Sequence, residues 1–142
     1  MALLGFTVFK DKLLDGSKRQ TIRKLRKRPI KVGDRLHLYW HLRRKDCEKL
    51  EESFFALQRE ITCTETFFIT MQFDPNFLNS GKPVWRIDRY ENPSLSGDFR
   101  TLFDHEVEDL ARRDGFDNAL QMMRWFYVRY PLYSTIFQVI RW

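Results

Sequence analysis

The chain has 142 residues, a length typical of one domain that can bury a sizeable hydrophobic core. A hydrophobic content of 43% and an aromatic content of 15% exclude an intrinsically disordered protein. The formal net charge of +6 indicates an anionic partner and carries no information about the fold.

Cysteine usage and hydropathy narrow the class of protein further. Cys47 and Cys63 form neither a CxxC pair nor a disulfide framework, so we expect both thiols to be reduced. No run approaches the ~20 apolar residues of a transmembrane helix. The apolar start of the chain lacks the basic region and cleavage site of a signal peptide. We therefore expect a single cytoplasmic domain over residues 1–142, with no membrane partner.

The first half of the chain predicts two strands separated by a short helix and a basic loop. Leu3–Val8 is a strand candidate, and Phe9–Asp15 can form one or two helical turns that end at Gly16. The basic loop follows and closes with a turn at 31–34. Apolar and polar residues then alternate over 35–40, which is typical of a half-buried strand.

The segment after this strand is polar and predicts a long excursion with a helical piece over 41–58. Alternation and β-branched or aromatic content predict the later strands. These strands are expected at 61–70, 84–90 and 134–142, with loops at 74–83 and 91–97. The last strand is apolar enough to lie at the centre of a sheet.

Two helices are expected before the final strand. Asp104 can cap a helix to about Arg113, which Gly115 ends. Asp117 can cap a second helix to about Tyr130. The order of elements predicts an α+β fold in which a mostly antiparallel sheet can close into a small β-barrel with flanking helices.

A basic segment between Ser17 and Gly33 is the most informative feature for function. It contains eight Lys or Arg residues and no carboxylate. Clustered cations can neutralise several phosphates of a nucleic acid, and an aromatic side chain can stack on a base. The residues expected to bind nucleic acid or phosphate are Lys18, Arg19, Arg23, Lys24, Arg26, Lys27, Arg28, Tyr39 and Trp40. Two alternatives stay open: the segment can be a solvated loop, and Trp40 can belong to the core.

Four short motifs resemble the ASCH domain, a branch of the PUA-like superfamily. They are the run GSKRQTIR at 16–23, the run KVGD at 31–34 with the strand after it, the run CTET at 63–66, and the run DGF at 114–116. Together they cover most of the chain, except for about 51–60 and 73–103. The resemblance implies a PUA-like β-barrel with a helix-lined cleft and a role that involves RNA or a nucleoside.

The same resemblance implies a set of catalytic residues. Some small bacterial ASCH proteins look like amidohydrolases that deacetylate N(4)-acetylcytidine, and carrying their motif over gives Lys18, Thr21 and Asp114. The family's carboxylate is a Glu, which is one methylene longer than Asp114. A Thr hydroxyl is a poor nucleophile until a base takes its proton. Lys18 can be that base only if its pKa falls from about 10.4 toward 7–8, and neighbouring cations favour such a fall. Alternatively, Lys18 only binds phosphate and Thr21 only hydrogen-bonds the loop.

Glu65 is a second candidate for the catalytic carboxylate. By alternation it falls on the apolar face of its strand, beside Cys63 and Phe67. A buried carboxylate needs a partner or a raised pKa. Glu65 can therefore replace Asp114, read the polar edge of a base, form an ion pair with an Arg, or turn outward at a β-bulge.

Three functions follow from these observations. The chain can be a module that binds RNA or a nucleoside, a metal-independent hydrolase of N(4)-acetylcytidine or single-stranded RNA, or a domain that binds an acidic protein. The acidic segment 104–114 can also cover the basic segment within the same molecule. No set of His and Cys residues has zinc-site spacing, and no glycine-rich nucleotide motif is present, so we expect no metal and no cofactor.

Overall fold

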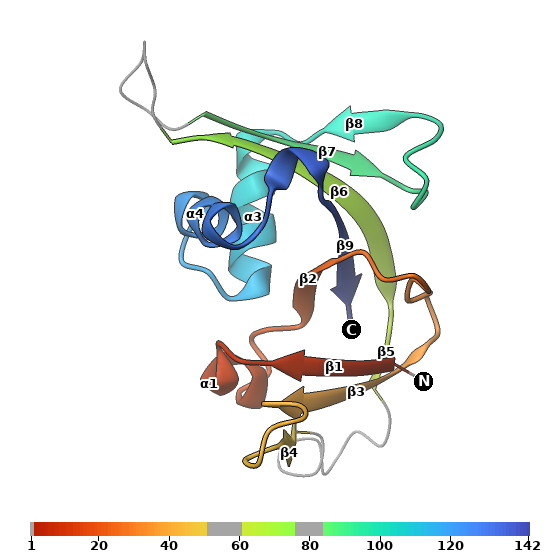
Figure 1. Cartoon of the computed structure of the whole chain (residues 1–142), viewed down its shortest axis with the longest axis vertical. Helices are drawn as coiled ribbons and strands as arrows, with labels where there is room; N and C mark the ends of the chain where they lie inside the picture. The colour runs from red at the N-terminus through yellow and green to blue at the C-terminus, as the bar shows by residue number, and fades with distance from the viewer. Residues whose placement is uncertain (1, 51–60, 76–83) are drawn as a thin grey trace.

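A computed structural model describes residues 2–50, 61–75 and 84–142 (Figure 1). One sheet contains β1 (Ala2–Phe6), β3 (Arg35–Trp40), β4 (Glu48–Lys49) and β5 (Ile61–Thr62). The other has the order β2 (Gln20–Lys24), β9 (Ile136–Arg141), β6 (Glu65–Asp74), β7 (Val84–Tyr90) and β8 (Phe99–Thr101). The helices are α1 (Lys10–Leu14), α3 (Asp104–Asp114), α4 (Ala119–Arg129) and the 3-10 turn η1 (Leu132–Ser134). The prediction of a small α+β fold is confirmed.

Strand β9 organises the five-stranded sheet because it pairs antiparallel with both β2 and β6. Its central place was expected from its apolar sequence, and residues 137–140 are all buried. Of the strand pairs in the described ranges, β1–β3 is parallel and the others are antiparallel. The mostly antiparallel character of the strands is therefore confirmed.

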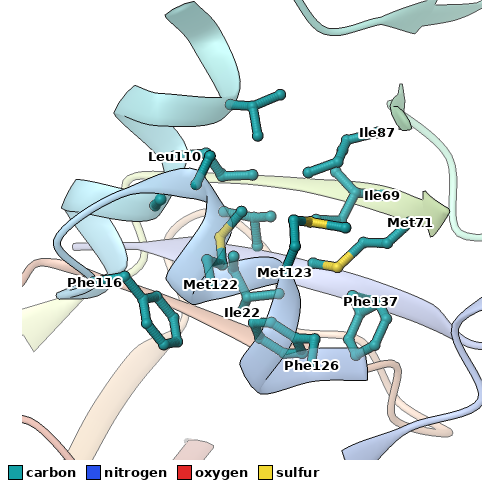
Figure 2. Packing of buried hydrophobic residues seen from close by; sticks show 14 of the residues in the cluster. Ile22, Ile69, Met71, Ile87, Leu110, Phe116, Met122, Met123, Phe126 and Phe137 are labelled. Atoms are coloured by element: carbon teal, nitrogen blue, oxygen red, sulfur yellow. The ribbon is translucent and has the colours of Figure 1, made fainter. Parts of the chain in front are cut away.

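The larger core lies between the five-stranded sheet and the helices α3 and α4, which cover one of its faces (Figure 1). The apolar residues of α4 recur with helical spacing, as on the buried face of an amphipathic helix. Figure 2 shows Met122, Met123 and Phe126 of this helix packed toward Ile69 and Phe137 of the sheet. This packing fixes the joint between α3 and α4 against the sheet.

A second core forms where β1 and β3 pack against α1 and β9. Leu4, Leu36 and Leu38 are fully buried in it, and Ile140 of β9 joins the same cluster. Because β9 contributes residues to both cores, the two sheets pack as one body.

Several boundaries differ from the sequence predictions. The segment expected to be a basic loop begins as strand β2, because Gln20, Thr21 and Ile22 pair with the central strand β9 and are buried. The strand expected at 61–70 is split into β5 and β6, which belong to different sheets. Strand β8 was not expected, since its three residues are exposed and carry no periodic signal. The predicted element at 41–58 and the loop at 74–83 lie partly outside the described residues.

The helix caps also differ by one position. Asn118, and not Asp117, caps α4, because the Asn118 side chain accepts a hydrogen bond from the backbone N–H of Gln121. Phe103 is the N-cap of α3, so Asp104 is the first helical residue. Gly115 ends α3 with a φ of 105°, as predicted for a glycine after a helix.

Arginine side chains join the edges of the two sheets. Arg23 on β2 donates a hydrogen bond to the carbonyl of Gly5, and Arg26 donates one of 2.8 Å to the carbonyl of Leu3. Both acceptors lie on β1. Within the described ranges no backbone pairing links β1 to β2 and no closed barrel forms, so side-chain hydrogen bonds join these two strands. We call this line of contact the β1–β2 seam.

Candidate functional site: a buried lysine–aspartate pair in an aromatic pocket

Lys18 is buried at the start of the basic segment, with 3% of its side chain exposed. Gly16 adopts a φ of 78° after α1, and the backbone N–H of Lys18 returns to the carbonyl of Lys12. After this turn the Lys18 side chain lies in the interior of the protein. The ammonium lies 3.2 Å from Oδ2 of Asp114 and also donates to the Asp114 carbonyl.

Asp114 is held by the joint between α3 and α4. Gly115 needs its positive φ, and a Cβ there would lie 2.9 Å from the ring of Phe9. Lys12 donates to the carbonyl of Gly115, and Phe116 packs edge-on against Phe9 at 5.1 Å. The joint is therefore held by contacts with Phe9 and Lys12 at α1 and by the buried ammonium of Lys18.

Burial governs the protonation of this pair. Burial lowers the pKa of Lys18, against the opposing charge and hydrogen bond of Asp114, while the charges of Arg23 and Lys12 contribute less to the fall. Burial likewise raises the pKa of Asp114, and Lys18 opposes it. The lowered lysine pKa agrees in direction with the sequence argument, but its main cause is desolvation and not the neighbouring cations.

Gln20 links this pair to a second cluster of charges. Its side-chain amide donates to Oδ1 of Asp114 at 3.4 Å and to the carbonyl of Leu110 at 3.0 Å. Its carbonyl oxygen accepts a hydrogen bond of 3.0 Å from Nε of Arg141. Gln20 is 1% exposed, so these bonds form inside the protein, where they orient the aspartate.

Glu65 belongs to that second cluster. Its carboxylate pairs with Arg141 at 2.8 Å and with Arg89 at 3.5 Å, and 43% of its side chain is exposed. Burial tends to raise the pKa of Glu65, but the two arginines hold it below its ordinary value. The side chain is not part of the cavity that contains Lys18. Of the alternatives for Glu65, the ion pair with arginine is the one observed.

Lys18, Thr21 and Asp114 line one cavity of about 340 Å³. Its aromatic lining residues are Phe6, Phe9, Phe116, Trp125, Phe126 and Tyr130. Thr21 lies on β2 and is buried, yet no hydrogen bond between its hydroxyl and Lys18 occurs in the described part of the chain. The cavity therefore brings together the three residues implied by the resemblance, without a preformed contact between hydroxyl and amine.

The basic segment divides between this cavity and a neighbouring groove. Arg23, Lys24 and Arg26 line the cavity, and Arg19 is exposed outside it. A groove of about 840 Å³ shares Gly5, Arg23 and Arg26 with the cavity. The further basic residues of the groove are Lys27, Arg28 and Arg43.

The aromatic residues expected to stack on a base lie elsewhere. Trp40 packs against the second core, where Lys10 lies 5.6 Å from its ring centroid and His41 stacks on it at 4.4 Å. Neither Tyr39 nor Trp40 lines the cavity or the groove. The aromatic walls are supplied instead by residues at the end of β1 and around α4, which no local motif marks as a site.

Two sequence-based expectations concern absences. No group of three or more His, Cys, Asp or Glu side chains with the geometry of a metal site occurs among the residues that the structure describes. In the same residues, no helix combines the length and apolar character needed to cross a membrane.

Sequence and structure comparisons do not assign this chain to a family. No family model, no curated protein and no solved structure matches it. The interpretation of the site therefore depends on its own residues and their geometry.

Proposed function

We propose that this protein binds RNA or a nucleoside, with a base held in the aromatic cavity beside Lys18, Thr21 and Asp114. The observation that carries the proposal is the convergence of these three residues in one cavity that has aromatic walls and a basic margin. A volume of about 340 Å³ lies near the lower end of the range for small-ligand sites, as suits a nucleoside.

The polar groups in the cavity suit the edge of a base. A lysine ammonium has three N–H donors, and Asp114 accepts from Lys18 through its carbonyl and through Oδ2. One donor is left for an acceptor on the ligand, such as a ring carbonyl oxygen. The Thr21 hydroxyl can both donate and accept, so the cavity offers the mixed pattern that a base edge needs.

The aromatic walls favour a flat, unsaturated ligand. Trp125 lines the cavity, and Arg129 lies over the Trp125 ring at 4.1 Å. Stacking of a base on an aromatic side chain contributes about 1–3 kcal/mol. The basic margin would then attract the phosphate of a nucleotide.

We propose the ASCH-like, PUA-like fold as the structural basis of this activity. The supporting observations are the two sheets, the mostly antiparallel pairing and the seam at which β1 and β2 meet through Arg23 and Arg26. The cavity lies at this seam, beside the joint of α3 and α4.

Calorimetric titration with the four ribonucleosides and their 5′-monophosphates tests the binding function. We expect at least one nucleoside to bind, and Trp125→Leu to weaken that binding about tenfold, since it removes a stacking wall. Lys18→Met should weaken it to a similar degree. Tyr133→Leu is the matched control, because Tyr133 is 91% exposed and lies outside the cavity. No binding of any nucleoside or nucleotide, or equal losses in Trp125→Leu and Tyr133→Leu, would contradict the proposal.

The lowered pKa of Lys18 favours a second candidate, hydrolysis of an N-acyl group on a nucleoside such as N(4)-acetylcytidine. The neutral Lys18 amine would take the proton of the Thr21 hydroxyl as that oxygen attacks the acyl carbon. The protonated amine would then return the proton to the departing nitrogen, which leaves an acyl ester on Thr21. Water would hydrolyse this ester and release the acid.

The pH dependence of acetate release tests this second candidate. Burial lowers the pKa of Lys18, and the neutral amine predominates once pH exceeds that pKa, so the rate should rise with pH and level off above it. Thr21→Val should reduce the rate by at least about 100-fold, while Thr21→Ser retains a hydroxyl and part of the activity. Lys18→Arg should remove the pH dependence together with the activity. Wild-type rates in Thr21→Val would refute the assignment.

A further inference from the structure

The cavity and the groove meet at the β1–β2 seam, and Arg23 lies at the junction. Arg23 and Arg26 line both spaces, together with Gly5 of β1. The two spaces therefore adjoin at the two arginines. An occupant of the cavity that extends past these arginines would reach the groove.

Arg23 has unused capacity to bind an anion at this junction. Its Nε is shielded from solvent and has no hydrogen-bond partner in the described part of the chain. A guanidinium has five N–H donors in a planar fork that matches two oxygens of a phosphate. A buried donor without a partner costs free energy, and a phosphate oxygen at the junction would remove that cost.

The groove continues the positive charge away from the cavity. Lys27 and Arg28 follow the seam along the chain, and Arg43 faces the groove from the segment after β3. Among the described residues these three side chains form no ion pair. Asp34 is the carboxylate in the lining, and it accepts a hydrogen bond of 2.8 Å from the backbone of Lys31. The volume of about 840 Å³ exceeds that of the cavity, so the groove has room for more than one phosphate.

We propose that the ligand is a single-stranded RNA whose base enters the cavity, whose adjoining phosphate binds Arg23 and Arg26 at the seam, and whose next nucleotides lie in the groove on Lys27, Arg28 and Arg43. This inference rests on the proposed function and narrows its ligand from a nucleoside to a strand. The free nucleoside fills only the first of the two spaces, so a strand binds more tightly.

Affinity for fluorescein-labelled hexaribonucleotides of each base, set beside affinity for the matching nucleosides, tests the inference. At 50 mM salt we expect the preferred hexanucleotide to bind at least tenfold more tightly than its nucleoside. The double variant Lys27→Ser/Arg43→Ser should reduce this ratio about tenfold. The slope of log affinity against log salt should fall by about 0.7 for each phosphate that the variant no longer neutralises. Arg23 is not the test residue, because its removal can disturb the seam itself.

The matched control removes the same charge from another surface. Arg112 and Arg124 are exposed on α3 and α4 and line neither space, so Arg112→Ser/Arg124→Ser should leave the ratio within twofold of the wild type. Equal losses in the two double variants, or a ratio near one in the wild type, would overturn the inference. Equal competition by a hexaglutamate peptide would also overturn it, because the groove would then be a surface for acidic peptides. A failure of the proposed function is a separate outcome: it appears as no binding of any nucleoside or nucleotide, or as equal losses in Trp125→Leu and Tyr133→Leu.

Discussion

Two clusters of opposite charges in this molecule differ chiefly in burial. The Lys18–Asp114 pair has side-chain exposures of 3% and 8%, whereas Glu65, Arg141 and Arg89 have exposures of 43%, 18% and 23%. In the exposed cluster the arginines hold the pKa of Glu65 below its ordinary value. In the buried cluster desolvation lowers the pKa of the lysine and raises that of the aspartate. The comparison teaches that burial decides the direction of the pKa shifts: desolvation favours the neutral forms of the interior pair, whereas partly solvated arginines keep the Glu65 carboxylate ionised.

The largest expected effect comes from breaking the buried pair. Asp114→Ala leaves the Lys18 ammonium without its partner in a desolvated site, which should lower the free energy of unfolding by about 3–5 kcal/mol. Urea denaturation measures this loss. The double variant Lys18→Met/Asp114→Leu removes both charges and should recover most of the stability. A loss below about 1 kcal/mol in Asp114→Ala would mean that the pair behaves like a surface ion pair.

Gln20 joins the two clusters, and its replacement should affect both stability and binding. Gln20→Leu removes the hydrogen bonds to Asp114 and Arg141 and should cost about 1–3 kcal/mol of unfolding free energy. Gln138→Leu is the matched control, since Gln138 is also 1% exposed. Its side-chain oxygen accepts from the backbone N–H of Ile30, and its side-chain NH₂ donates to the carbonyl of the same residue. We expect similar losses of stability in the two variants but weaker nucleoside binding only in Gln20→Leu, as measured by calorimetry. Equal nucleoside affinities of Gln20→Leu and Gln138→Leu would show that Gln20 does not position the site.

The glycine after Asp114 tests how firmly the buried cluster is held. Gly115→Ala introduces a Cβ 2.9 Å from Phe9 at a positive φ, and we expect a loss of about 1–3 kcal/mol together with weaker nucleoside binding. Gly97→Ala meets open space at a φ of 83°, so only the backbone strain of about 1 kcal/mol should remain. Thermal unfolding of the two variants measures the difference. Identical losses would show that the contact with Phe9 does not constrain the joint.

The smallest expected effect comes from the exposed cluster. Glu65→Gln should lower the free energy of unfolding by less than about 1 kcal/mol at pH 7, because the carboxylate is partly solvated. The folded-state pKa of Glu65 lies below its unfolded value, so its stabilising contribution is present above about pH 4.3 and disappears as pH falls through the folded value. The stabilities of wild type and variant should therefore converge in acid, as denaturation at several pH values can measure. A gap that widens in acid would contradict this sign.

The sequence predicted the elements whose signal is local. The strand at 84–90 was predicted with the observed bounds, and the short helix before Gly16 is α1. Strand β2 was missed because it lies inside a segment rich in Lys and Arg, and its pairing with β9 joins residues more than 100 positions apart. Alternation placed Glu65 on the same face of β6 as Phe67, but it could not show that Arg89 and Arg141 lie beside this first residue of the strand.

The site was predictable in part. The resemblance to the ASCH motifs implied Lys18, Thr21 and Asp114, and these three residues line one cavity. The sequence could not identify Gln20 or Arg141, because their roles depend on contacts between residues 90 or more positions apart. The aromatic walls were missed because no local signal in the sequence separates an aromatic cavity wall, such as Trp125 or Tyr130, from an aromatic core residue.

The β1–β2 seam also covers part of an open sheet edge. In the described ranges β1 and β2 each end a sheet, and an open sheet edge offers backbone groups on which another chain can form a strand. The guanidinium groups of Arg23 and Arg26 already occupy two carbonyls of β1. A charged side chain on a sheet edge discourages a second chain from pairing there. The same two arginines that line the cavity and the groove thus leave fewer free backbone acceptors on this edge for a strand of another chain.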